Sequence, residues 1–133
     1  MKLKGFDKWR KEKGYKHVFA VWSVATKNKA GYAGVVLLSK TRPSKVCFDI
    51  ENDKSFDGRV ITAQYETTIL VGAYSQCGGY DDEKEALKHR FDKAMNKHCA
   101  IISQESKEKP IMICADLNVN NCGSKMPSHC AKL

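Results

Sequence analysis

The sequence predicts a layered α/β (α+β) sandwich in which mixed β-sheets are flanked by helices. Three observations predict it. Runs rich in β-branched and aromatic residues fill the first half of the chain. One long segment from Asp82 repeats its apolar residues every three or four positions, which is typical of a helix. Another apolar run, Ile111–Ala115, follows that segment, so we expect strands on both sides of the helix.

The chain is expected to begin with a short helix. Phe6 and Trp9 share one helical face, and Gly14 stands where a glycine commonly ends a helix. The β-branched and aromatic residues of His17–Val24 predict a strand. Gly34–Ser39 is a continuous apolar run, which predicts a strand buried on both faces.

A hairpin is expected in the middle of the chain. Val46, Phe48 and Ile50 alternate with polar residues, which indicates a half-exposed strand before it. Arg59–Tyr65 and Thr68–Tyr74 then predict two strands joined by a tight turn.

The second half is expected to hold a long helix and a last strand. Acidic residues, Asp81 and Asp82, precede the helical pattern, where the helix dipole favours them. The predicted helical face consists of Leu87, Phe91, Ala94, Met95, Cys99 and Ile102. Pro110 opens a second buried strand, and residues 120–133 are polar and predict a loosely ordered tail. We therefore expect one partial domain over residues 1–119 and a tail over residues 120–133.

Composition narrows the function classes. The chain has 133 residues, with 23 Lys and Arg against 15 Asp and Glu, a formal net charge of +8. This excess favours polyanionic partners such as nucleic acids, although many basic proteins bind none. There is no apolar stretch long enough to span a membrane and no apolar run behind Met1–Gly5, so we expect a chain that is not exported. The six cysteines are accordingly expected to be reduced thiols.

Polar side chains at two strand ends mark the strongest candidate site. Asp116 follows an apolar run directly, and Asn118 comes two residues later. A carboxylate and an amide at the carboxyl edge of a sheet can hold a water molecule or a metal ion against a phosphate. Tyr74 ends another predicted strand, where its hydroxyl can donate to a phosphate oxygen. The alternatives are an ordinary Asx turn at Asp116 and a tyrosine that merely closes the core.

Other candidate features are weaker. Gly31-Tyr32-Ala33-Gly34 is a glycine-flanked turn whose backbone N–H groups could approach a phosphate, but such turns are common. His98 and Cys99 lie on the predicted helix, and His129 and Cys130 lie in the tail. No C-x-x-C or H-x₃₋₅-H spacing accompanies them, so the sequence argues against a zinc site.

Several of these segments together resemble one family. The stretch from Lys109 to Val119 reads KPIMICADLNV, similar to the K-P-hydrophobic run and G-D-L-N-V signature of exodeoxyribonuclease III and abasic-site endonucleases. Asp57–Ala63 resembles their E-G-R-V-I-T-A strand, and Gly31–Gly34 resembles their G-Y-S-G turn. Tyr74 and Arg90-Phe91-Asp92 stand where the family has the tyrosine of Y-V-P-N and R-W-D. The order agrees over the roughly ninety residues of the central portion of the family domain.

The resemblance implies a fold and a set of roles. The fold is that of the endonuclease/exonuclease/phosphatase superfamily, and the reaction is Mg²⁺- or Mn²⁺-dependent hydrolysis of the phosphodiester 5′ to an abasic site in duplex DNA, with 3′–5′ exonuclease activity in some members. The implied catalytic residues are Tyr74, Asp116 and Asn118, with Asp116 also touching the metal directly or through water. The implied DNA-binding residues are Gly31, Tyr32 and Arg59.

The chain also departs from the family pattern. The early Asn and Glu that help to hold the metal have no counterpart before Gly31, and the later Asp and final S-D-H segment have none after Val119. Y-V-P-N has become Tyr74-Ser75-Gln76-Cys77, without the asparagine. These departures predict impaired hydrolysis.

Four functional hypotheses follow. The first is a DNA-repair nuclease of impaired activity. The second is a catalytically inactive DNA-binding module, and the third is a phosphatase or phosphodiesterase of the same superfamily. The fourth is a truncated gene product that does not fold stably. The basic net charge and the expected role on DNA favour a nuclear location. By contrast, the last three residues, Ala131-Lys132-Leu133, are similar to a peroxisomal import signal.

Overall fold

The protein is a layered α/β sandwich, described by a computed structural model over residues 5–23, 33–51, 53–77, 82–106 and 109–118. Its elements in chain order are α1 (Phe6–Glu12), β1 (His17–Trp22), β2 (Gly34–Ser39), β3 (Lys45–Cys47), the 3₁₀ turn η1 (Lys54–Phe56), β4 (Val60–Gln64), β5 (Ile69–Tyr74), α2 (Asp82–Glu105) and β6 (Ile111–Asp116). Neither described helix is long and apolar enough to cross a membrane.

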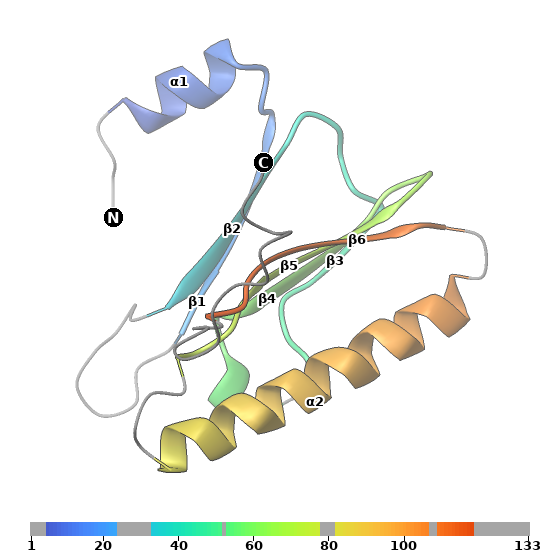
Figure 1. Cartoon of the computed structure of the whole chain (residues 1–133). Helices are drawn as coiled ribbons and strands as arrows, with labels where there is room; N and C mark the ends of the chain where they lie inside the picture. The colour runs from blue at the N-terminus through green and yellow to red at the C-terminus, as the bar shows by residue number, and fades with distance from the viewer. Residues whose placement is uncertain (1–4, 24–32, 52, 78–81, 107–108, 119–133) are drawn as a thin grey trace, which may run out of the picture.

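The strands form two sheets. β1 and β2 make an antiparallel pair, and the second sheet has the order β3-β4-β5-β6. β4 and β5 are antiparallel, whereas β5 and β6 are parallel, so the larger sheet is mixed. Parallel strands need a long connection, and α2 supplies it. Figure 1 shows α2 running along one side of this sheet.

The main core lies between α2 and the larger sheet. Alternate residues of β4 and β5, including Val60, Ile69 and Val71, face Phe91 and Ala94 of α2. This alternation follows from the two-residue period of strands, and the contacts on α2 follow its helical period. Phe56 of η1 meets the Phe91 ring edge-on at 5.4 Å between centroids.

The smaller sheet packs on the opposite face of β4 and β5. A side chain built at Gly72 would lie 3.3 Å from Val35 Cγ1 of β2, so the two sheets approach closely there. Gly58 (φ 76°) leaves even less room for a side chain, because a Cβ atom there would lie 2.0 Å from the Ser23 backbone nitrogen. Glycine is therefore required where the start of β4 passes the end of β1.

Most predicted elements are confirmed. α1 is followed by Gly14 at φ 79°, the left-handed conformation expected after a helix end. The hairpin forms with Tyr65 N–H donating to Thr68 O at 2.8 Å. The long helix is confirmed as α2, but Asp82, which was expected just before it, lies in its first turn; Asp81 and residues 120–133 lie outside the described residues. The described cysteines, Cys47, Cys77, Cys99 and Cys114, are free thiols.

Three predictions about strands are wrong. β2 is covered on one face only, and Val36 on its other face is 58 % exposed. β6 is not buried: it lies at the edge of the sheet formed by the described strands, where Met112 is 57 % and Ile113 53 % exposed. The predicted strand from Val46 to Ile50 stops at Cys47, because the chain then leaves the sheet. An apolar run shows that a segment can be covered, but the covering layer has to come from elsewhere in the fold.

Candidate functional site

The candidate site lies at the carboxyl ends of β5 and β6. The parallel register pairs Tyr74 with Asp116, so the last residues of the two strands lie side by side on one face of the sheet. Ser75 N–H donates to Asp116 O at 2.8 Å, which extends the ladder beyond Tyr74. The structure thus brings together two residues that are 42 positions apart in the sequence.

Asn118 is held to both strands. Its backbone N–H donates to Asp116 Oδ1 at 3.0 Å, which is the Asx turn considered above. Its side-chain Nδ2 donates to Ser75 O at 2.7 Å. The backbone of Asn118 is left-handed (φ 46°), a conformation that asparagine tolerates better than most residues. Asn118 therefore forms the Asx turn and at the same time joins the two strand ends of the candidate site.

Arg59, the residue just before β4, supports Tyr74. Its Nη1 donates to Tyr74 O at 3.2 Å, and its guanidinium carbon lies 5.4 Å from the centre of the Tyr74 ring. Tyr74 N–H donates back to Arg59 O at 2.8 Å. Arg59 is only 7 % exposed. This geometry favours a role in fixing Tyr74, and direct contact between Arg59 and DNA stays a prediction.

The structure adds three residues that the sequence did not single out as site residues. Ser75 is fully buried between the two strand ends. Lys88 of α2 donates from Nζ to Ser75 Oγ at 3.0 Å and to Leu117 O at 2.8 Å. Gln76 is 8 % exposed, and both polar atoms of its amide are buried without a hydrogen-bond partner among the described residues. No sequence signal marks Lys88, because its role depends on how α2 packs.

Two predicted DNA-binding residues cannot be placed. Gly31 and Tyr32 lie outside the described residues, so their relation to Asp116 stays a prediction. Gly34, at the end of the same predicted turn, begins β2.

The described residues do not fit a complete metal site. In the described parts of the chain, no group of three or more His, Cys, Asp and Glu side chains is arranged to hold a metal ion. Asp116 is the carboxylate placed at the paired strand ends, and one of its oxygens already accepts the Asn118 N–H group. Mg²⁺ binds near-octahedral sets of oxygen ligands, often one or two carboxylates completed by water and substrate phosphate. We therefore derive no chemical step through a metal.

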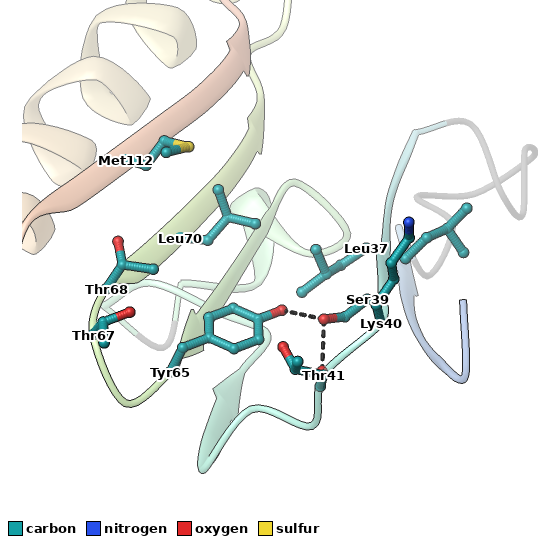
Figure 2. Close-up of a pocket in the computed structure, with 10 residues that line it drawn as sticks. Leu37, Ser39, Lys40, Thr41, Tyr65, Thr67, Thr68, Leu70 and Met112 are labelled. Carbon is teal, nitrogen blue, oxygen red and sulfur yellow. Dashed lines mark hydrogen bonds between the residues drawn. The ribbon is translucent and has the colours of Figure 1, made fainter. Parts of the chain in front are cut away.

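A separate pocket of about 360 Å³ opens at the other end of β5. Figure 2 shows Tyr65, which donates from its hydroxyl to Ser39 Oγ at 2.8 Å. Ser39 Oγ in turn donates to Thr41 O at 2.6 Å. The described lining is aliphatic and hydroxylic, with Lys40 as its charged residue and no carboxylate, imidazole or thiol. Its described lining therefore offers no carboxylate, imidazole or thiol that could hold a metal ion.

Comparison with known proteins identifies relatives. The chain is 36 % identical over 105 residues to a DNA-(apurinic or apyrimidinic site) endonuclease of Arabidopsis thaliana, covering 75 % of this chain and 28 % of the relative. It is 30 % identical over 106 residues to an exodeoxyribonuclease of Bacillus subtilis, covering 77 % of this chain and 38 % of the relative. No family model matches the chain.

A solved structure supports the fold. A 3′ phosphatase from Neisseria, bound to a product DNA hairpin, superposes with a TM-score of 0.63 at 19 % sequence identity. The match covers 92 % of this chain and 46 % of that one. The chain thus spans less than half the length of each of these three proteins.

Proposed function

This chain is a relative, over part of their length, of the abasic-site endonucleases and exodeoxyribonucleases, and on that premise we propose that it binds duplex DNA at the ends of β5 and β6. The substrate is DNA that contains abasic sites, and the reaction suited to the site is hydrolysis of the phosphodiester 5′ to the lesion. The observation that carries the proposal is the pairing of Tyr74 with Asp116, with Asn118 tied to both strands.

Each side chain has a distinct part in this proposal. The Tyr74 hydroxyl donates a hydrogen bond to a phosphate oxygen, and the Asp116 carboxylate accepts a proton from the attacking water. Asn118 already donates from Nδ2 to Ser75 O. Its Oδ1 is the atom left to accept a hydrogen bond from the same water. The roles of these three residues rest on their geometry and on the family resemblance.

DNA binding is expected to be retained, whereas cleavage is expected to be slow. The net charge of +8 favours the DNA backbone, with an affinity that falls as salt rises. Family membership implies Mg²⁺ or Mn²⁺, yet the described residues offer too few ligands for it. We therefore propose that DNA binding is retained and that cleavage is slow. A 3′–5′ exonuclease reaction would use the same residues.

The experiment uses a fluorescent duplex that carries one stable abasic-site analogue. Binding is measured by anisotropy at several salt concentrations, and cleavage is measured on gels with Mg²⁺ or with EDTA. Asp116→Asn is compared with Asp49→Asn, which changes the net charge identically at an exposed position outside the site. We expect Asp116→Asn to lower the cleavage rate by at least about a hundredfold, the effect of losing a general base. Asp49→Asn should cut like the wild type.

The outcomes separate the two proposed properties. Salt-dependent binding with no cleavage by either the wild type or Asp116→Asn would support the inactive DNA-binding module and exclude hydrolysis by this chain. Equal cleavage by the wild type and Asp116→Asn would point to a contaminating nuclease. Absence of binding at low salt would overturn the proposal as a whole.

A further inference from the structure

Ser75 joins the two strands that carry the candidate site. Its N–H donates to Asp116 O at 2.8 Å, and its carbonyl accepts from Asn118 Nδ2 at 2.7 Å. Its hydroxyl accepts from Lys88 Nζ at 3.0 Å. Ser75 is completely buried, so water cannot replace these partners. The positions of Asp116 and Asn118 therefore depend on how Ser75 is held.

Lys88 holds Ser75 from the helix layer. Its ammonium group also donates to Leu117 O at 2.8 Å and lies 3.7 Å from Asp92 Oδ2. The lysine side chain is 17 % exposed, which is low for a residue type that usually reaches into solvent. One ammonium group, with three donors, thus connects α2, the segment after β5 and the end of β6.

We propose that Lys88 is a positioning residue for the candidate DNA phosphodiester site. The inference rests on the proposed function. Lys88 fixes Leu117 O, and so keeps Asn118 in its left-handed conformation with Nδ2 on Ser75. Asparagine tolerates this conformation better than most residues, but it is still less favourable than the right-handed one, so contacts around residue 118 help to hold it. Without the ammonium group, residues 117 and 118 relax, and the Asn118 amide leaves Ser75.

Two simpler roles compete with positioning. Lys88 could act only as one more positive charge that attracts DNA, or only as a structural link that stabilises the fold. A charge-only role predicts that any lysine removed from α2 has the same effect. A structure-only role predicts loss of stability without a specific change at Asn118.

The test compares three variants of the full chain. Lys88→Met removes the ammonium group and keeps a flexible apolar stem, and Lys88→Arg restores a cation with several donors. Lys93→Met removes the same charge from an exposed position on α2. The first readout is the ¹⁵N–¹H signal of the Asn118 side-chain amide, assigned by its loss in Asn118→Ala. The second readout is affinity for the abasic-analogue duplex, and thermal melting shows that each variant is folded.

Lys88→Met should move the Asn118 amide signal to the position of a solvent-exposed amide. It should also lower DNA affinity about tenfold, the loss typical of a charge-assisted contact. Lys93→Met should leave the amide signal unchanged and lower affinity no more than about twofold, as expected for one distant charge. Lys88→Arg should restore the amide signal and most of the affinity.

Two results would overturn the inference. One is a Lys88→Met protein whose Asn118 signal and DNA affinity match those of Lys93→Met. The other is an unchanged Asn118 signal with a specific loss of affinity, which would make Lys88 a direct DNA contact. If the wild type binds no DNA, the proposed function fails, but the amide signal of the free protein still decides whether Lys88 positions Asn118.

Discussion

At the scale of single residues, Gln76 carries an energetic cost. Both polar atoms of its amide are buried, and neither has a hydrogen-bond partner in the part of the chain that the structure describes. It lies two positions after Tyr74, on the same segment as Ser75. Burying an unsatisfied polar group costs about 1–3 kcal/mol. Such a cost beside a candidate site is typical of residues that serve function at the expense of stability.

Gln76→Met is therefore expected to raise the free energy of unfolding by about 1–2 kcal/mol, because methionine fills a similar volume without polar atoms. Urea denaturation measures the change. Gln104→Met, at an exposed position of α2, serves as the control and should stay within about 0.5 kcal/mol of the wild type. A destabilised Gln76→Met protein would contradict the prediction and indicate that the amide is bonded to an internal water molecule.

The sequence predicted part of the geometry of the candidate site, whereas the catalytic roles of its residues stay a prediction. Tyr74 and Asp116 were predicted from strand ends, which depend on local pattern, and the register places them side by side. Arg59 shows the limit of that reasoning. Its type and motif suggested a DNA contact, but its exposure depends on packing against Tyr74, which no local pattern contains. The same holds for Lys88, whose partners come from two distant segments.

At the scale of elements, a hydrogen bond links α2 to the sheet. His98 Nε2 lies 2.8 Å from Thr62 Oγ1 of β4, at the part-buried interface between the helix and the strand. Burial lowers the pKa of His98 below its usual value of 6.5, although the carboxylates of Asp49 and Glu105 oppose the shift. The folded protein thus disfavours the charged imidazole.

This shift predicts that acid weakens the attachment of α2. As pH falls below about 6.5, the unfolded chain binds a proton at His98 before the folded protein does, so stability falls until the folded pKa is passed. His98→Gln cannot titrate and should lose less stability than the wild type between about pH 7.5 and pH 5.5. Urea denaturation at both pH values measures the difference. His89→Gln, an exposed histidine on the same helix, should follow the wild type, and equal behaviour of His98→Gln would refute the prediction.

Element types followed well from sequence, whereas their burial did not. The periods of β4, β5 and α2 are local properties, and the structure confirms those elements. Whether β2 and β6 are covered depends on which layers lie beside them. Val36 and Ile113 lie in apolar runs, yet each is more than half exposed. The apolar runs therefore predicted more buried strand faces than the structure has.

At the scale of the whole molecule, the described part of the chain has one well-packed interface and several open surfaces. The core between α2 and the larger sheet is closed around Phe91 and Val71. By contrast, the outer edge of β6 pairs with no described strand, and Met112, Ile113 and Leu117 are each more than half exposed there. The Arabidopsis and Bacillus relatives are each more than twice as long as the matched region.

An open, apolar strand edge promotes pairing between chains, because its backbone N–H and C=O groups lack partners. We therefore predict that the protein associates as its concentration rises and that Ile113→Lys suppresses this association by placing a charge on the edge. Sedimentation velocity at two concentrations measures it, and a non-associating variant should remain at 14.9 kDa. Val36→Lys adds the same charge at an equally exposed position on β2 and should associate like the wild type. If Val36→Lys suppresses association and Ile113→Lys does not, the outer face of the smaller sheet, and not the β6 edge, is the adhesive surface.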